Sequence, residues 1–205
     1  MCKSVLRLLL TLAMTLCLVS WVAIAEIEPS RITWDQTTPI TWDLFQGIPP
    51  ADAAQRTEAA AIHMTLRWHA SYAVSSSNGG ATWTGQVAAI TVTNTMEPDQ
   101  SWVVPGKAFD GVLSHEQLHF DLNEVYRRKL ECRLLETISC QASTQQATID
   151  QLVSALSKTA NAILLQAEET QELYDSETSH STDAAGQARW QAVISQWLLA
   201  PLTAP

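Results

Sequence analysis

The sequence predicts an α+β fold in which a small antiparallel sheet is followed by a long helix and two further helices. Two observations support this prediction. From residue 31 to about residue 104 the chain consists of short β-like pieces separated by turns, and from residue 110 almost to its end the apolar residues recur at helical spacing. Strands followed by helices are typical of the α+β class.

The first 25 residues are predicted to be a secretory signal peptide. Lys3 and Arg7 precede an apolar run over residues 8–19, and Ala23 and Ala25 form a small-x-small cleavage signature. Because the run is short for a membrane span and no second one follows, we expect cleavage after Ala25, a periplasmic or extracellular location, and no stable membrane insertion afterwards. An uncleaved membrane anchor is the alternative.

The remaining residues, 26–205, are predicted to form one domain, since 180 residues are enough for a single core. Without Lys3 and Arg7 this part has 10 basic and 21 acidic residues, a net charge of −11. Such an acidic surface repels nucleic acid, so nucleic-acid binding is not expected. The oligomeric state is not predicted.

The predicted sheet is centred on one antiparallel hairpin. Residues 68–74 and 81–95 are rich in β-branched or aromatic residues at a period near two, and residues 75–80 form the loop between them. Shorter extended pieces are expected at residues 32–34, 40–42 and 101–104. The alanine-rich residues 51–66 favour a short helix that leads into a strand.

Three helices are expected after the sheet. Asp110 is a good N-cap for a helix over residues 111–136, and helices over residues 144–174 and 184–199 follow. The short connection between the first two requires antiparallel packing. Cys132 and Cys140, the cysteines outside the signal peptide, are expected to form a disulfide, which requires the first helix to end between them. Thiolate ligands for a metal are the alternative.

The most informative motif is His115-Glu116-Gln117-Leu118-His119, an HExxH sequence within an apolar stretch. On a helix, positions i and i+4 share one face, so the two imidazoles can bind one Zn²⁺ ion while the glutamate reaches a water at the metal. The motif therefore predicts a zinc site with Glu116 as general base. A chance match on a solvated helix is the alternative.

A catalytic zinc needs a third protein ligand, which must come from later in the chain. The best candidates lie in residues 174–180, where the second helix returns toward the motif. We expect His180 as the ligand, with Asp175 as the main alternative and Glu172 and Glu177 behind it. His63 and His69 are more remote candidates. Tyr174, or whichever of His180 and Asp175 is not a ligand, is then the candidate donor to the oxyanion.

A small sheet beside a helix with this motif predicts a zincin-like architecture. In proteases of that plan an edge strand holds the extended substrate by backbone hydrogen bonds, so residues 81–95 are the candidate strand by analogy, with an ordinary structural hairpin as the alternative. Asp121, two residues after His119, is a candidate to orient a ligand, and a solvated carboxylate is the alternative.

The combined motifs resemble a bacterial family of unknown function whose members are predicted to be secreted zinc-dependent proteases. The resemblance rests on residues 115–121, on Tyr174, Asp175, Thr178 and His180, on residues 187–190, and on residues 40–47 and 101–102. The family pattern usually has glycine after the last histidine, where this chain has Ser181. The resemblance implies a fold and a reaction class but no substrate.

The sequence thus predicts a secreted zinc metallopeptidase that acts on a polypeptide substrate. Zinc would lower the pKa of its bound water toward about 7, and Glu116 would take the proton and pass it to the leaving amine. Two alternatives remain open at this point: a non-catalytic extracytoplasmic binding protein on a zincin scaffold, and a zinc amidase of cell-wall peptides.

Overall fold

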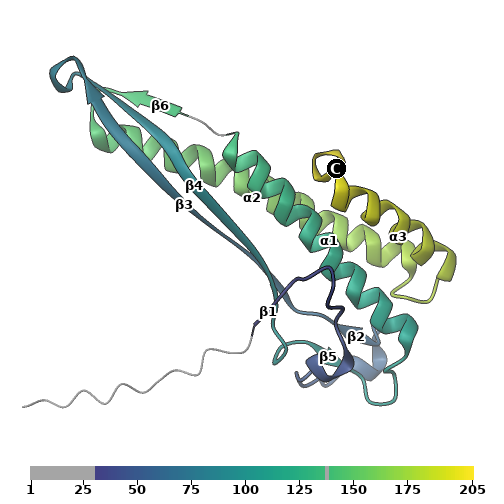
Figure 1. Cartoon of the computed structure of the whole chain (residues 1–205). Coiled ribbons are helices and arrows are strands. Elements are labelled where there is room, and N and C mark those ends of the chain that lie inside the picture. The colour runs from purple at the N-terminus through teal and green to yellow at the C-terminus, as the bar shows by residue number, and fades with distance from the viewer. Residues whose placement is uncertain (1–30, 137–138) are drawn as a thin grey trace, which may run out of the picture.

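The computed structural model describes residues 31–136 and 139–205, so the predicted signal peptide lies outside the described residues. The strands are β1 (Ile32–Thr33), β2 (Ala60–Ala61), β3 (Met64–Ser77), β4 (Thr82–Met96), β5 (Trp102–Val103) and β6 (Ser139–Ala142), and the α-helices are α1 (Asp110–Leu135), α2 (Gln145–Thr178) and α3 (Ala184–Leu199) (Figure 1). The strand pairs are antiparallel. The predicted α+β class with three helices is confirmed.

The hairpin of β3 and β4 forms a long arm beside α2 (Figure 1). It is paired from Met64 opposite Met96 to Ser77 opposite Thr82, so it is longer than the sequence pattern predicts. The three serines before the turn are exposed, and their lack of alternating apolar residues hides the strand from a period-two search. Positive φ angles at Asn78, Gly79 and Gly80 close the turn.

β4 is not the edge strand that the sequence analysis expects. It pairs with β3 along its length and with β6 and β1 near its two ends. These additional partners come from distant parts of the chain, which the alternation within residues 81–95 cannot reveal. β2 and β5 form a separate two-stranded sheet.

The predicted helix over residues 51–66 is wrong. Only Ala53–Gln55 form a 3₁₀ turn, and the rest of the segment contains β2 and the start of β3. Ala60 is buried and lies opposite Val103 of β5, so tertiary pairing overrides the helix propensity of the alanines. Trp42–Leu44 also form a 3₁₀ turn rather than a strand.

The helices follow the predicted order with changed ends. Phe109, not Asp110, is the N-cap of α1. α2 begins one residue after the predicted start. Thr144 is its N-cap, whose Oγ1 accepts a hydrogen bond from the backbone N–H of Ala147, and the helix continues four residues past Tyr174 to Thr178. α3 has the predicted bounds, and the Asp183 carboxylate caps it by accepting a hydrogen bond from the N–H of Ala185.

Two clusters of buried apolar residues stabilise the fold, and α1 takes part in both. The larger cluster joins one face of the hairpin to the three helices, with Leu122, Leu130, Leu152 and Ile194 at its centre. The smaller cluster lies around β2 and contains Ile40, Phe45, Met96, Val112 and Phe120. The N-terminal half of α1, with the HExxH motif, lies where the two clusters meet.

The predicted disulfide is not formed in this structure. Cys132 and Cys140 are free, half-buried thiols, the first inside α1 and the second on β6. α1 continues past Cys132 to Leu135, and β6 is held by its pairing with β4. Within the described residues, no helix is long and apolar enough to cross a membrane.

Candidate metal centre

The N-terminal half of α1 buries three polar side chains of the motif. His115 and Glu116 are each 3% exposed and His119 is 9% exposed. The two imidazoles, one helical turn apart, have their Nε2 atoms 3.1 Å from each other. The local spacing therefore brings the histidines together as the sequence predicts.

Asp175 on α2 supplies a third polar group at the same point. Its Oδ1 atom lies 3.0 Å from Nε2 of His115 and 2.9 Å from Nε2 of His119. One ligand atom of each residue lies within 4.8 Å of the other two, a spacing at which the three could hold a metal ion. The extension of α2 beyond Tyr174 places this carboxylate above the motif.

The donor set of this group fits zinc. Zinc bonds of about 2.0–2.2 Å to nitrogen and oxygen can reach three atoms that lie about 3 Å apart, and two imidazoles with one carboxylate form a known catalytic ligand set. Burial alone would raise the pKa of Asp175, but its hydrogen bonds with His115 and His119 hold that pKa below its ordinary value. Burial lowers the pKa of His119, but Asp175 and Glu116 outweigh it and raise that pKa.

Glu116 lies beside the three-residue group and is held by the backbone. Its Oε2 accepts a hydrogen bond of 2.8 Å from the N–H of Ile62, just after β2. Burial raises the pKa of Glu116, although the nearby histidines oppose this shift. The glutamate is therefore oriented by a strand segment that the sequence analysis did not connect to the site.

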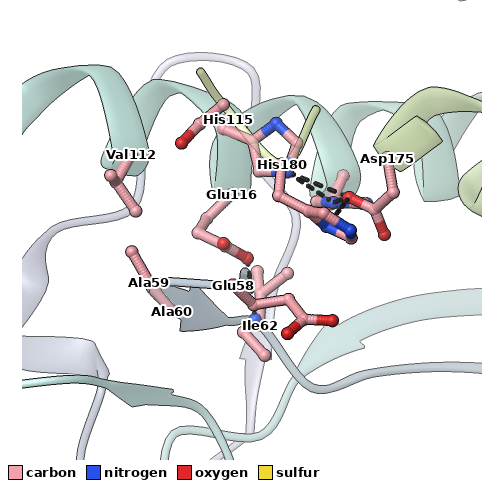
Figure 2. A pocket seen from close by; sticks show the side chains of 12 residues that line it. Glu58, Ala59, Ala60, Ile62, Val112, His115, Glu116, Asp175 and His180 are labelled. Carbon is pink, nitrogen blue, oxygen red and sulfur yellow. Dashed lines mark hydrogen bonds and ion pairs between the residues drawn. The ribbon is translucent and has the colours of Figure 1, made fainter. Parts of the chain in front are cut away.

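A cavity of about 120 Å³ joins these groups. Figure 2 shows Glu116 pointing from α1 toward the segment with Ala59, Ala60 and Ile62, while His115, His180 and Asp175 lie above it. One wall of the cavity is thus formed by side chains of α1, α2 and the turn after α2, and the other wall is formed by residues 58–62. A small molecule or chain segment in this space contacts both the candidate ligands and Glu116.

Two glutamines that the sequence analysis missed orient the histidines. Gln171 donates from Nε2 to the carbonyl of His119 at 3.0 Å, which turns its Oε1 toward Nδ1 of the same residue at 2.6 Å. Nδ1 must then carry the proton, which leaves Nε2 for a metal. Oε1 of Gln187 lies 3.2 Å from Nδ1 of His115. Gln171 could have been found as the residue one helical turn before Asp175.

His180 lines the cavity but lies outside the three-residue group. Its Nδ1 is 3.5 Å from Oδ1 of Asp175 and has no hydrogen-bond partner within the described residues. The residue stands in a turn where Ser179, His180 and Ser181 have φ angles of 48°, 49° and 77°. The structure thus places Asp175, the alternative, where the sequence analysis expects His180.

Tyr174 lies behind the histidines and does not line the cavity. It is fully buried, its ring stacks on His115 with 4.7 Å between centroids, and its hydroxyl donates toward the His115 carbonyl and Oε1 of Gln187. Burial raises the pKa of this hydroxyl far above its ordinary value. This position suits a residue that supports His115 rather than one that contacts an oxyanion.

The other predicted contributors lie elsewhere. Asp121 accepts hydrogen bonds from Trp34 Nε1 and Gln117 Nε2, both at 2.8 Å, and so pins the N-terminal segment to α1 rather than orienting a histidine. Glu177 accepts a hydrogen bond from Trp190 Nε1. His63 and His69 are not among the residues that line the cavity.

Comparison with known protein families identifies the family of the chain. Residues 42–181 match the model of a family described as bacterial protein of unknown function (DUF922). The match includes the motif, Asp175 and His180 but ends before Gln187. No curated protein and no solved structure matches the chain.

Proposed function

The chain belongs to the DUF922 family of bacterial proteins of unknown function, and we propose that it is a zinc-dependent peptidase that acts outside the cytoplasm. The observation that supports this most is the position of Glu116, a buried carboxylate that lines the same cavity as three candidate metal ligands. A non-catalytic binding protein has no use for a general base there, which favours the enzyme over that alternative.

Three atoms would hold the zinc ion: Nε2 of His115, Nε2 of His119 and Oδ1 of Asp175. The bound ion would supply Lewis acidity, which makes water acidic enough to lose a proton near neutral pH and polarises the scissile carbonyl. Gln171 and Gln187 would keep the imidazoles in the tautomer that can bind metal.

Glu116 acts in this proposal as the general base. The Ile62 N–H holds one of its oxygens and leaves the other for a water in the cavity. Glu116 takes a proton from the attacking water and transfers it to the leaving amine. In the metal-free protein, burial raises the pKa of Glu116 above its ordinary value.

With Asp175 as the third ligand, His180 is the group left to donate to the oxyanion, since it lines the cavity and its Nδ1, which lies 3.5 Å from Oδ1 of Asp175, forms no hydrogen bond within the described residues. Among the described strands β2 pairs only with β5 and forms part of the cavity wall. Its other edge is therefore the place where an extended substrate backbone would hydrogen-bond.

The test is cleavage of a mixed peptide library by the zinc-loaded protein, read by mass spectrometry. The matched variants are Glu116→Gln and Glu169→Gln, the second at an exposed position on α2. We expect products from the wild type and Glu169→Gln, and a loss of at least about 100-fold in Glu116→Gln with zinc still bound. A folded, zinc-bound wild type that gives no products would contradict the proposal and favour the binding protein.

A further inference from the structure

A second cavity, here called the side groove, adjoins the candidate metal centre. It has a volume of about 420 Å³ and lies between the start of β3 and one face of α2. Asp175 lines both cavities, so the side groove meets the first cavity at a candidate metal ligand. A polypeptide bound at the metal centre has space there for one of its side chains.

The residues of α2 that line the side groove recur at helical spacing. Leu164, Ala167, Glu168, Gln171, Glu172 and Asp175 follow one another at alternating steps of three residues and one residue, so they share one side of the helix. Met64 and Leu66 form the opposite wall. Besides Asp175, the groove therefore has two carboxylates beside apolar residues, those of Glu168 and Glu172, one helical turn apart.

The charge of these two carboxylates is not compensated nearby. Both residues are exposed, and within residues 31–136 and 139–205 neither forms an ion pair. In the part of the chain that the structure describes, no lysine or arginine lines the side groove or the cavity beside it, whereas Glu58 adds a further carboxylate to the first cavity. A ligand with a positive charge would be attracted to this side of the metal centre.

We propose that the side groove binds a lysine or arginine side chain of the substrate, close to the bond that is cleaved. This inference rests on the proposed function. The long aliphatic stem of such a side chain can pack against Met64 and Leu66 while its charged end reaches Glu168 and Glu172. A glutamate side chain is repelled at the same place, and an apolar one leaves both carboxylates without a partner.

The experiment uses peptides that are identical except at one position, which carries lysine, norleucine or glutamate. Norleucine has the length of the lysine stem without its charge. The varied position is moved through three residues on each side of the scissile bond. At one of these positions we expect zinc-loaded wild type to prefer lysine over norleucine by about 10-fold in kcat/KM, and glutamate to be the poorest.

The preference must depend on the two carboxylates. The double variant Glu168→Gln, Glu172→Gln is expected to cleave lysine and norleucine peptides equally, whereas Glu169→Gln, next to the groove residues but outside it, keeps the preference. Added salt should reduce the preference in the wild type. Equal kcat/KM for the two peptides at every position, or a preference that survives in the double variant, overturns the inference and leaves the peptidase proposal intact.

Binding gives a readout that does not need catalysis. Affinities of the same fluorescent peptides for zinc-loaded Glu116→Gln are measured by anisotropy, with and without the two groove substitutions. Tighter binding of the lysine peptide that disappears with the groove substitutions supports the inference. Equal affinities overturn it even if no cleavage is found with the wild type.

Discussion

The two halves of α1 bury glutamates in different ways. In the C-terminal half, Glu124 accepts hydrogen bonds of 2.8–2.9 Å from the guanidinium groups of Arg127 and Arg128. In the N-terminal half, Glu116 accepts a hydrogen bond from the backbone N–H of Ile62 and faces a cavity. Both glutamates are 3% exposed, so burial alone does not distinguish them. The difference is that Glu124 is paired with arginine side chains of the protein, whereas Glu116, within the described residues, is not.

Other buried groups of the two halves show the same contrast. Lys129 donates from Nζ to Oε1 of Gln166 at 2.9 Å and to the carbonyls of Ala204 and Pro205, which fixes the C-terminal segment to α1. His115 and His119 instead direct their Nε2 atoms at each other and at one carboxylate oxygen. Buried groups with complete partners stabilise the fold, whereas groups that converge on one point are arranged for a ligand.

The largest expected effect is on the free energy of unfolding, through a substitution in the C-terminal half of α1. Glu124→Ala leaves Arg127 and Arg128 without their buried partner, so we expect the free energy of unfolding to fall by about 3 kcal/mol. Glu116→Gln in the metal-free protein should change it by less than about 1 kcal/mol, because Gln keeps the acceptor for Ile62. Urea unfolding of both variants measures the difference. Equal losses would remove the distinction between the two halves.

The next effect is on metal affinity. Asp175→Asn should weaken zinc binding at least about 100-fold, because the neutral amide is a poor ligand. His180→Asn should leave zinc affinity within about threefold, since His180 lies outside the three-residue group. Competition with a chromophoric chelator gives both constants. A larger loss in His180→Asn than in Asp175→Asn would show that His180 is the third ligand.

A smaller effect on zinc affinity is expected from Gln171, which contacts the candidate ligand His119. Gln171→Leu removes the acceptor that orients His119, and zinc affinity should fall about 10-fold while the fold is retained. Gln151→Leu, at an exposed position on α2, is the control and should have no effect. Chelator competition again measures the change, and identical affinities of the two variants would exclude a positioning role for Gln171.

The smallest effect concerns the turn that holds His180. Ser181 has a φ of 77°, which glycine adopts without strain, so Ser181→Gly should raise the free energy of unfolding by about 0.5–1 kcal/mol. Ser176→Gly, inside α2, should lower it by about the same amount. Thermal unfolding of the two variants tests this. Destabilisation by Ser181→Gly would mean that the serine side chain has a role of its own.

The part of the site that the HExxH motif forms could be predicted because its geometry depends only on neighbouring residues. The spacing of His115 and His119 on a helix determines that their rings share one side, whatever packs around them. The third helix and the presence of the hairpin were predictable for the same reason, since each depends on neighbouring residues, whereas the N-cap of α1 and the full length of the hairpin were not.

The remaining parts of the site depend on contacts between distant segments. The polar residues after Tyr174 favour a helix end there, but Thr178 is buried and its hydroxyl bonds the Tyr174 carbonyl, so the helix continues and carries Asp175 to the histidines. The alanines before Ile62 form a strand only because Ala60 and Ala61 pair with Val103 and Trp102. No local pattern encodes that pairing.

Whether the N-terminal half of α1 forms a metal site can be tested by the anomalous scattering of zinc in crystals of the zinc-loaded protein. We expect one strong peak at about 2.0–2.2 Å from Nε2 of His115, Nε2 of His119 and Oδ1 of Asp175, beside the carboxylate of Glu116. If crystals grown with stoichiometric zinc show no peak beside these three atoms, or show the peak at other residues, the proposed metal site is wrong.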